Sequence, residues 1–189
     1  GVEFLDRMCH PLRNVTRKRP YSVFLAGNHE RRLNNVLESQ PELGSSAKSG
    51  IGYKDYHLMY YHNELVYYEG QTAGIYSLEG ISFAHYMVSG LMGRPIGGEH
   101  HAASLLAKNH TSCVVAHSHT VDWSVRSSPT GNRIMGLVAG VYQDYDSPWA
   151  GNISHLWWRG IVHLRNVENG EFDPEFVSLG SLRRQYGAS

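Results

Sequence analysis

The stretch that decides the fold class begins at Tyr21-Ser-Val-Phe-Leu-Ala26. Its apolar, β-branched and aromatic residues predict a buried strand over residues 21–26. Gly27-Asn28-His29-Glu30 follows as a tight turn, and the pattern over residues 31–38 predicts a helix. A strand, a glycine turn and a helix in this order are typical of α/β proteins, in which functional residues gather at the carboxyl ends of strands.

The rest of the chain continues this mixture of strands and helices. Thr111-Ser-Cys-Val-Val-Ala116 predicts a second buried strand, which leads into His117-Ser118-His119. Apolar runs separated by turn residues predict three β-hairpins. The hairpins are expected over residues 75–85, 121–141 and 161–179, helices over 2–15 and 100–109, and loops over 40–52, 89–99 and 142–158. We therefore expect one α/β domain over residues 1–189.

Length and composition limit the classes of protein that need to be considered. The chain has 189 residues, and its 17 Lys and Arg balance its 17 Asp and Glu. This neutral charge does not favour binding to long nucleic acids, which normally requires a basic excess. No run approaches the ~18 apolar residues of a membrane span, and two cysteines, Cys9 and Cys113, point to a reducing compartment. We expect a cytoplasmic protein with no membrane partner.

Three histidine-bearing segments share one property, which is that each follows a predicted strand. These segments are Asn28-His29, His85 and His117-Ser118-His119. In extended backbone, residues i and i+2 point the same way, so His117 and His119 can face one site. Imidazole nitrogens and a carboxamide oxygen together suit a divalent transition metal. The sequence therefore predicts a metal site where these strand ends converge.

Each segment also has an ordinary structural interpretation. Asn28 can cap a helix whose first turn contains Glu30, His85 can be a hydrogen-bonded core histidine, and His117 and His119 can be structural residues. It is the order and common placement of the three segments that favour a site.

The motifs LAGNHE, FAHY and VVAHSH, in this order within residues 20–165, resemble those of the calcineurin-like metallophosphoesterases. The SGLMGRPIGGEH run and the late WW-R-G stretch are similar to a phage and prophage subgroup, which would place the protein in a host cytoplasm. The resemblance implies an α/β sandwich with mixed central sheets flanked by helices. It also implies hydrolysis of a phosphate mono- or diester by water activated between two divalent ions, such as Mn, Zn, Fe or Ni.

The resemblance assigns roles to individual residues. Asn28, His85 and His117 would hold the second metal ion, and His119 would hold the first. His29 would face the substrate phosphate as an acid or electrostatic partner, oriented by Glu30.

Residues outside these motifs allow more than one interpretation. Arg94 could bind the substrate phosphate through its two-pronged guanidinium or could be a solvated loop residue. Asp144 and Asp146 could support the metal ligands or could simply be solvated. An aromatic group could stack on a nucleotide base, fill the core or form an interface; its members are Tyr142, Tyr145, Trp149, Trp157 and Trp158.

The sequence departs from the family pattern upstream of Asn28. The D-x-H and G-D-x-x-D motifs, which carry most ligands of the first metal ion, are absent, and Ala116 replaces the usual glycine. We therefore expect the C-terminal portion of the family fold, completed by a missing N-terminal segment or by another chain. The alternative is an inactive binding or assembly module that keeps the fold without the chemistry.

Overall fold

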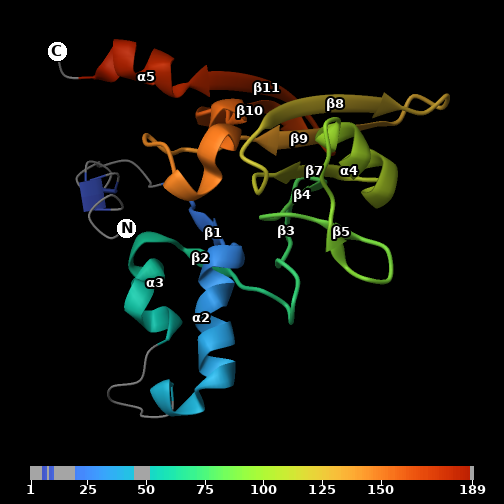
Figure 1. Cartoon of the computed structure of the whole chain (residues 1–189). Helices are drawn as coiled ribbons and strands as arrows, with labels where there is room; N and C mark the ends of the chain where they lie inside the picture. Colours follow the sequence, from blue (N-terminus) through green and yellow to red (C-terminus); the bar gives the residue numbers. More distant parts are fainter. Residues whose placement is uncertain (1–5, 8, 11–19, 45–51, 188–189) are drawn as a thin grey trace. The chain divides into compact units, whose positions relative to one another are not determined.

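A computed structural model describes residues 6–7, 9–10, 20–44 and 52–187 of the chain (Figure 1). The chain divides into two units, residues 1–74 and 75–189, and each is described by itself. Residues 6–7 and 9–10 are helical, and the rest of the helix expected over 2–15 lies outside the described residues.

The first unit contains the predicted strand, glycine turn and helix. Strand β1 (Val23–Leu25) leads through Gly27 into helix α2 (Asn28–Ser39), so the helix begins three residues before the predicted start. β1 pairs in parallel with β2 (Glu64–Val66). The segment before β2 had no clear sequence pattern, and it forms short helical turns, η2 (Tyr53–Tyr56) and α3 (Leu58–Tyr61). A further turn, η1 (Pro41–Leu43), follows α2, and residues 45–51 of the expected loop lie outside the described residues.

The second unit is built on a five-stranded mixed sheet. Its strands, in spatial order, are β3 (Tyr76–Leu78), β4 (Ile81–Phe83), β7 (Ser112–Val115), β9 (Arg133–Ala139) and β8 (Val121–Ser127). β4, β7 and β9 are parallel, whereas the edge strands β3 and β8 are antiparallel to their neighbours. The expected α/β class, and the hairpins β3–β4 and β8–β9, are confirmed.

Helix α4 (His101–Asn109) packs against one face of this sheet. The packing is close because Gly136 on β9 lies directly beneath the helix: a Cβ there would be 2.7 Å from the carbonyl oxygen of Ala102. The buried side chains of this face include Leu105, Leu106, Cys113, Val115 and Val138.

The third expected hairpin covers the other face of the sheet. It consists of β10 (Gly160–Glu168) and β11 (Glu171–Ser178), and its most deeply buried hydrophobic side chain is that of Phe172, only 2% exposed. Phe172 packs with Ile81, Met135 and Leu137 in a second hydrophobic cluster. On β9, Leu137 packs in this second cluster and its neighbour Val138 packs in the cluster beneath α4. The central sheet is therefore buried on both faces.

Two hairpin turns contact each other at the end of the second unit. Glu79 and Gly80, between β3 and β4, both have positive φ angles of 50° and 78°, and Asn169 and Gly170, between β10 and β11, have 50° and 87°. The Gly170 N–H donates a hydrogen bond of 2.7 Å to the Glu79 carbonyl. A Cβ on Gly80 would be 2.8 Å from the Gly170 nitrogen, so the contact depends on glycine.

Three segments differ from the expectations. The glycine-rich loop over 89–99 contains a small hairpin, β5 (Val88–Ser89) with β6 (Arg94–Pro95). The loop over 142–158 contains the helical segment η3 (Pro148–Leu156). The strand expected to end at 179 ends at Ser178 and is followed by helix α5 (Leu179–Tyr186). In the part of the chain that the structure describes, no helix has the length and apolar character needed to cross a membrane.

Candidate functional site

His85 and His117 lie side by side at the carboxyl ends of β4 and β7. These strands are parallel neighbours, with Phe83 opposite Val114, so their carboxyl ends share one edge of the sheet. Beyond the strands, the His117 N–H still donates to the His85 carbonyl at 3.0 Å. The Nε2 atom of His85 and the Nδ1 atom of His117 form a hydrogen bond of 3.0 Å. The structure therefore brings these two predicted site residues together.

The pair has the spacing of two ligands of one metal ion. Two imidazole nitrogens that each lie about 2.0–2.1 Å from a tetrahedral ion are separated by roughly 3.3 Å, close to the 3.0 Å between His85 and His117. The pair alone does not complete a site, since no group of three or more His, Cys, Asp or Glu among the described residues could hold a metal ion. Cys113 is fully buried, and burial raises the pKa of its thiol to about 11.

His119 occupies a different conformation from the one assumed for it. Residues 117–118 form a turn rather than extended backbone, and His119 has a left-handed φ of 61°. The i, i+2 alternation of extended backbone, from which we predicted that His117 and His119 point the same way, therefore does not apply to these residues. The His119 ring packs edge-on against the indole of Trp157, with the ring centroids 4.4 Å apart at 89°.

Asn28, His29 and Glu30 begin helix α2 in the first unit. Gly27, rather than Asn28, is the N-cap residue, and its N–H donates to Oε2 of Glu30 at 2.7 Å. This contact gives the Glu30 carboxylate a helix-capping role. Asn28 is half-buried and His29 is exposed. Since the two units are described separately, the expected convergence of Asn28 and His29 with His85 and His117 stays a prediction.

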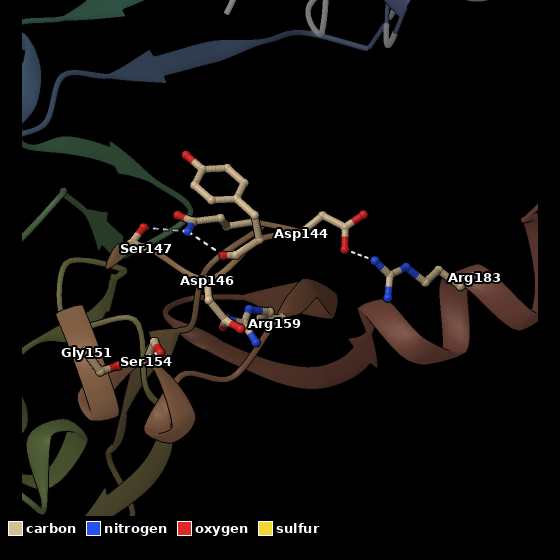
Figure 2. Close-up of polar contacts among 9 residues, drawn as sticks. Asp144, Asp146, Ser147, Gly151, Ser154, Arg159 and Arg183 are labelled. Carbon is tan, nitrogen blue, oxygen red and sulfur yellow. Dashed lines mark hydrogen bonds and ion pairs between the residues drawn. The ribbon is translucent and has the colours of Figure 1, made fainter. Parts of the chain in front are cut away.

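The loop after β9 is held in place by polar contacts of its acidic residues (Figure 2). Oδ1 of Asp146 accepts a 2.5 Å bond from Arg159, and Asp144 forms an ion pair with Arg183 of α5. These residues line a pocket of about 210 Å³ together with Tyr145, Leu179 and Gly180. Asp144 and Asp146 are thus largely exposed to solvent and are each paired with an arginine.

Arg94 takes no part in the contacts of that loop. It lies on the short strand β6 and is exposed to solvent. Its predicted contact with a substrate phosphate stays a prediction.

His101 is a buried residue near the pair that was not singled out in the sequence. It is 2% exposed, and its Nδ1 atom lies 3.1 Å from the hydroxyl of Ser118, between His117 and His119. Burial lowers the pKa of His101; the charge of Asp122 and a backbone hydrogen bond with Ile96 oppose this effect, and the nearby His117 adds a smaller lowering. The sequence does contain an indication that His101 is buried, because residues 101 and 105 share one face of a helix at i, i+4 spacing.

None of the comparisons with known proteins finds a relative of this chain. No protein-family model, no curated protein and no solved structure matches it.

Proposed function

We propose that this chain is a metal-dependent phosphoesterase with the α/β sandwich of the calcineurin-like metallophosphoesterases, acting on a phosphate mono- or diester. The observation that carries the proposal is the 3.0 Å separation between the ring nitrogens of His85 and His117. These residues stand at the carboxyl ends of two adjacent parallel strands, where α/β proteins place their active sites.

The residues have distinct tasks in this proposal. In this proposal His85 and His117 would hold one ion, with the carboxamide of Asn28 as the further ligand that the resemblance implies, and His119 would contribute to a second ion. When bound, such ions lower the pKa of a water molecule and neutralise charge on the phosphate. His29 donates a proton or a hydrogen bond to the leaving oxygen, and Arg94 binds a phosphate oxygen.

Metal binding by substituted chains tests this proposal. The full chain, with and without His85→Ala or His117→Ala, is equilibrated with Mn²⁺ or Zn²⁺, and bound metal is measured by elemental analysis. We expect each substitution to weaken binding by more than the roughly 10- to 100-fold that loss of an outer-shell partner costs. His163→Ala, at an exposed position on β10, is the matched control.

Turnover of p-nitrophenyl phosphate and bis-p-nitrophenyl phosphate is measured on the same samples. Hydrolysis that requires added metal and is lost with His85→Ala supports the proposal. Equal metal content in the wild type and in a chain with both histidines substituted contradicts it.

An inactive binding or assembly module is the second candidate. The observation that favours it is the lack of a group of three or more ionisable ligands among the described residues. In that case the chain binds no metal stoichiometrically, and His85 and His117 serve only to join β4 to β7. Loss of thermal stability without any metal dependence in His117→Ala would support this second function.

A further inference from the structure

Trp149 is an exposed tryptophan that is separated from His119 by one aromatic ring, the indole of Trp157. Trp157, which contacts the His119 ring edge-on, is only 8% exposed and acts as part of the core. Trp149 lies against Trp157 on its other side, with the centroids 5.6 Å apart and the rings inclined at 48°. Trp149 itself is 72% exposed. An open indole is therefore available close to a proposed metal ligand.

The segment that carries Trp149 is fixed at several points. Nε2 of Gln143 donates to the hydroxyl of Ser147 at 2.8 Å, directly before η3. Within η3 the hydroxyl of Ser154 donates to the Gly151 carbonyl at 2.8 Å (Figure 2). At the far end, the Trp158 N–H donates to the His119 carbonyl at 3.0 Å, which ties the loop to the turn carrying His119. A side chain on such a segment loses little conformational freedom when a ligand stacks on it.

We propose that Trp149 is the stacking platform for a nucleobase, so that the substrate is a nucleoside phosphate ester. This inference rests on the proposed phosphoesterase function, because it places the phosphate beside His119. In a nucleotide one sugar separates the phosphate from the base, and here one ring, Trp157, separates His119 from Trp149. An exposed indole binds a planar base through its π-face.

The overall charge of the chain favours a small substrate over a long nucleic acid. Long single strands are bound by a basic groove together with successive stacked bases. The chain carries equal numbers of acidic and basic residues, and the platform offers one exposed indole, separated from His119 by Trp157. A mononucleotide or a small nucleoside diester fits these features better than a polynucleotide.

The test compares two substrates that differ only in the presence of a nucleoside. Thymidine 5′-(p-nitrophenyl phosphate) and methyl p-nitrophenyl phosphate share the same leaving group. We expect Trp149→Ala to raise KM for the thymidine ester by roughly 10- to 100-fold, the range set by stacking of one base, and to leave KM for the methyl ester unchanged. Trp149→Tyr, which keeps an aromatic ring, should retain most of the preference. Trp123→Ala, at an exposed tryptophan of β8, is the matched control.

A binding measurement separates this inference from the proposed function. Quenching of tryptophan fluorescence by thymidine 5′-monophosphate should be lost in Trp149→Ala and retained in Trp123→Ala, with ribose 5-phosphate as the ligand lacking a base. Quenching that depends on Trp149, in a chain that neither binds metal through His85 and His117 nor hydrolyses either ester, refutes the phosphoesterase function and leaves the platform standing. Hydrolysis that is insensitive to Trp149→Ala refutes the platform alone. A chain that shows no quenching by thymidine 5′-monophosphate, no metal binding and no hydrolysis refutes both proposals.

Discussion

His101 makes the stability of the metal-free protein depend on pH. Burial lowers its pKa in the folded chain, whereas an unfolded histidine titrates near 6.5. As the pH falls below about 6.5, the unfolded chain takes up a proton that the folded chain does not. The free energy of unfolding therefore falls, with a slope approaching about 1.4 kcal/mol per pH unit for this residue. Burial lowers the pKa of His62 as well, so part of the effect comes from that residue.

Urea unfolding in EDTA at pH 7.5 and pH 5.5 measures this effect. We expect His101→Gln to lose less stability between the two values than the wild type. His163→Gln, at an exposed position, should behave like the wild type. An unchanged pH dependence in His101→Gln would show that its burial does not control the titration.

A substitution of His29 tests the proposed chemistry without changing any of the proposed metal ligands. It is exposed at the start of α2, and an acid at the leaving oxygen typically contributes about 10²–10⁴-fold. We expect His29→Asn to lower kcat by that factor in an active form of the protein, with metal content unchanged by elemental analysis. Loss of metal in this variant would instead make His29 a ligand.

Proximity within the candidate site could be predicted from the sequence only where strand pairing enforces it. His85 and His117 each follow an apolar run, and parallel pairing of those runs places both side chains at one edge. The conformation of His119 could not be predicted, because a histidine in the left-handed region depends on the turn around it. His101 could not be predicted from strand ends, because it lies on helix α4.

At the scale of elements, the contact between α4 and β9 depends on the absence of a side chain at Gly136. A Cβ there would meet the Ala102 carbonyl oxygen at 2.7 Å and the Leu106 side chain at 3.0 Å. Overpacking of this kind costs about 1–3 kcal/mol, so we expect Gly136→Ala to lower the free energy of unfolding by that amount in urea. Gly97→Ala, where no atom lies within 4 Å of the added Cβ, is the control. Equal stability of the two variants would mean that α4 can shift freely.

The hairpins were predictable and the last helix was not. Glu79-Gly80 and Asn169-Gly170 lie between apolar runs and adopt the positive φ angles that such turns require. Helix α5 follows β11 without a break, and its start depends on the Ser178 hydroxyl accepting the Ser181 N–H at 3.2 Å. The strands β5 and β6 are two residues each, too short for a pattern to develop.

At the scale of the whole molecule, residues 75–189 contain both hydrophobic clusters described for their sheet. We expect a fragment of residues 75–189 to fold by itself, with a cooperative urea transition and a near-ultraviolet circular dichroism spectrum. A fragment of residues 75–159, which lacks β10 and β11, would expose the cluster around Ile81, Met135 and Leu137 and should bind a hydrophobic dye or aggregate. Absence of tertiary signal in the longer fragment would show that it requires residues 1–74.

The contact between two hairpin turns also determines where the chain can accept new sequence. The turns at Glu79-Gly80 and Asn169-Gly170 are hydrogen-bonded to each other at 2.7 Å and leave no room for a side chain on Gly80. The turn between β8 and β9 is exposed, and no atom lies within 4 Å of a Cβ added at Gly131. Peptide tags, labels or new termini created by circular permutation therefore belong at residues 129–131, where length can vary without separating the β10–β11 hairpin from the sheet.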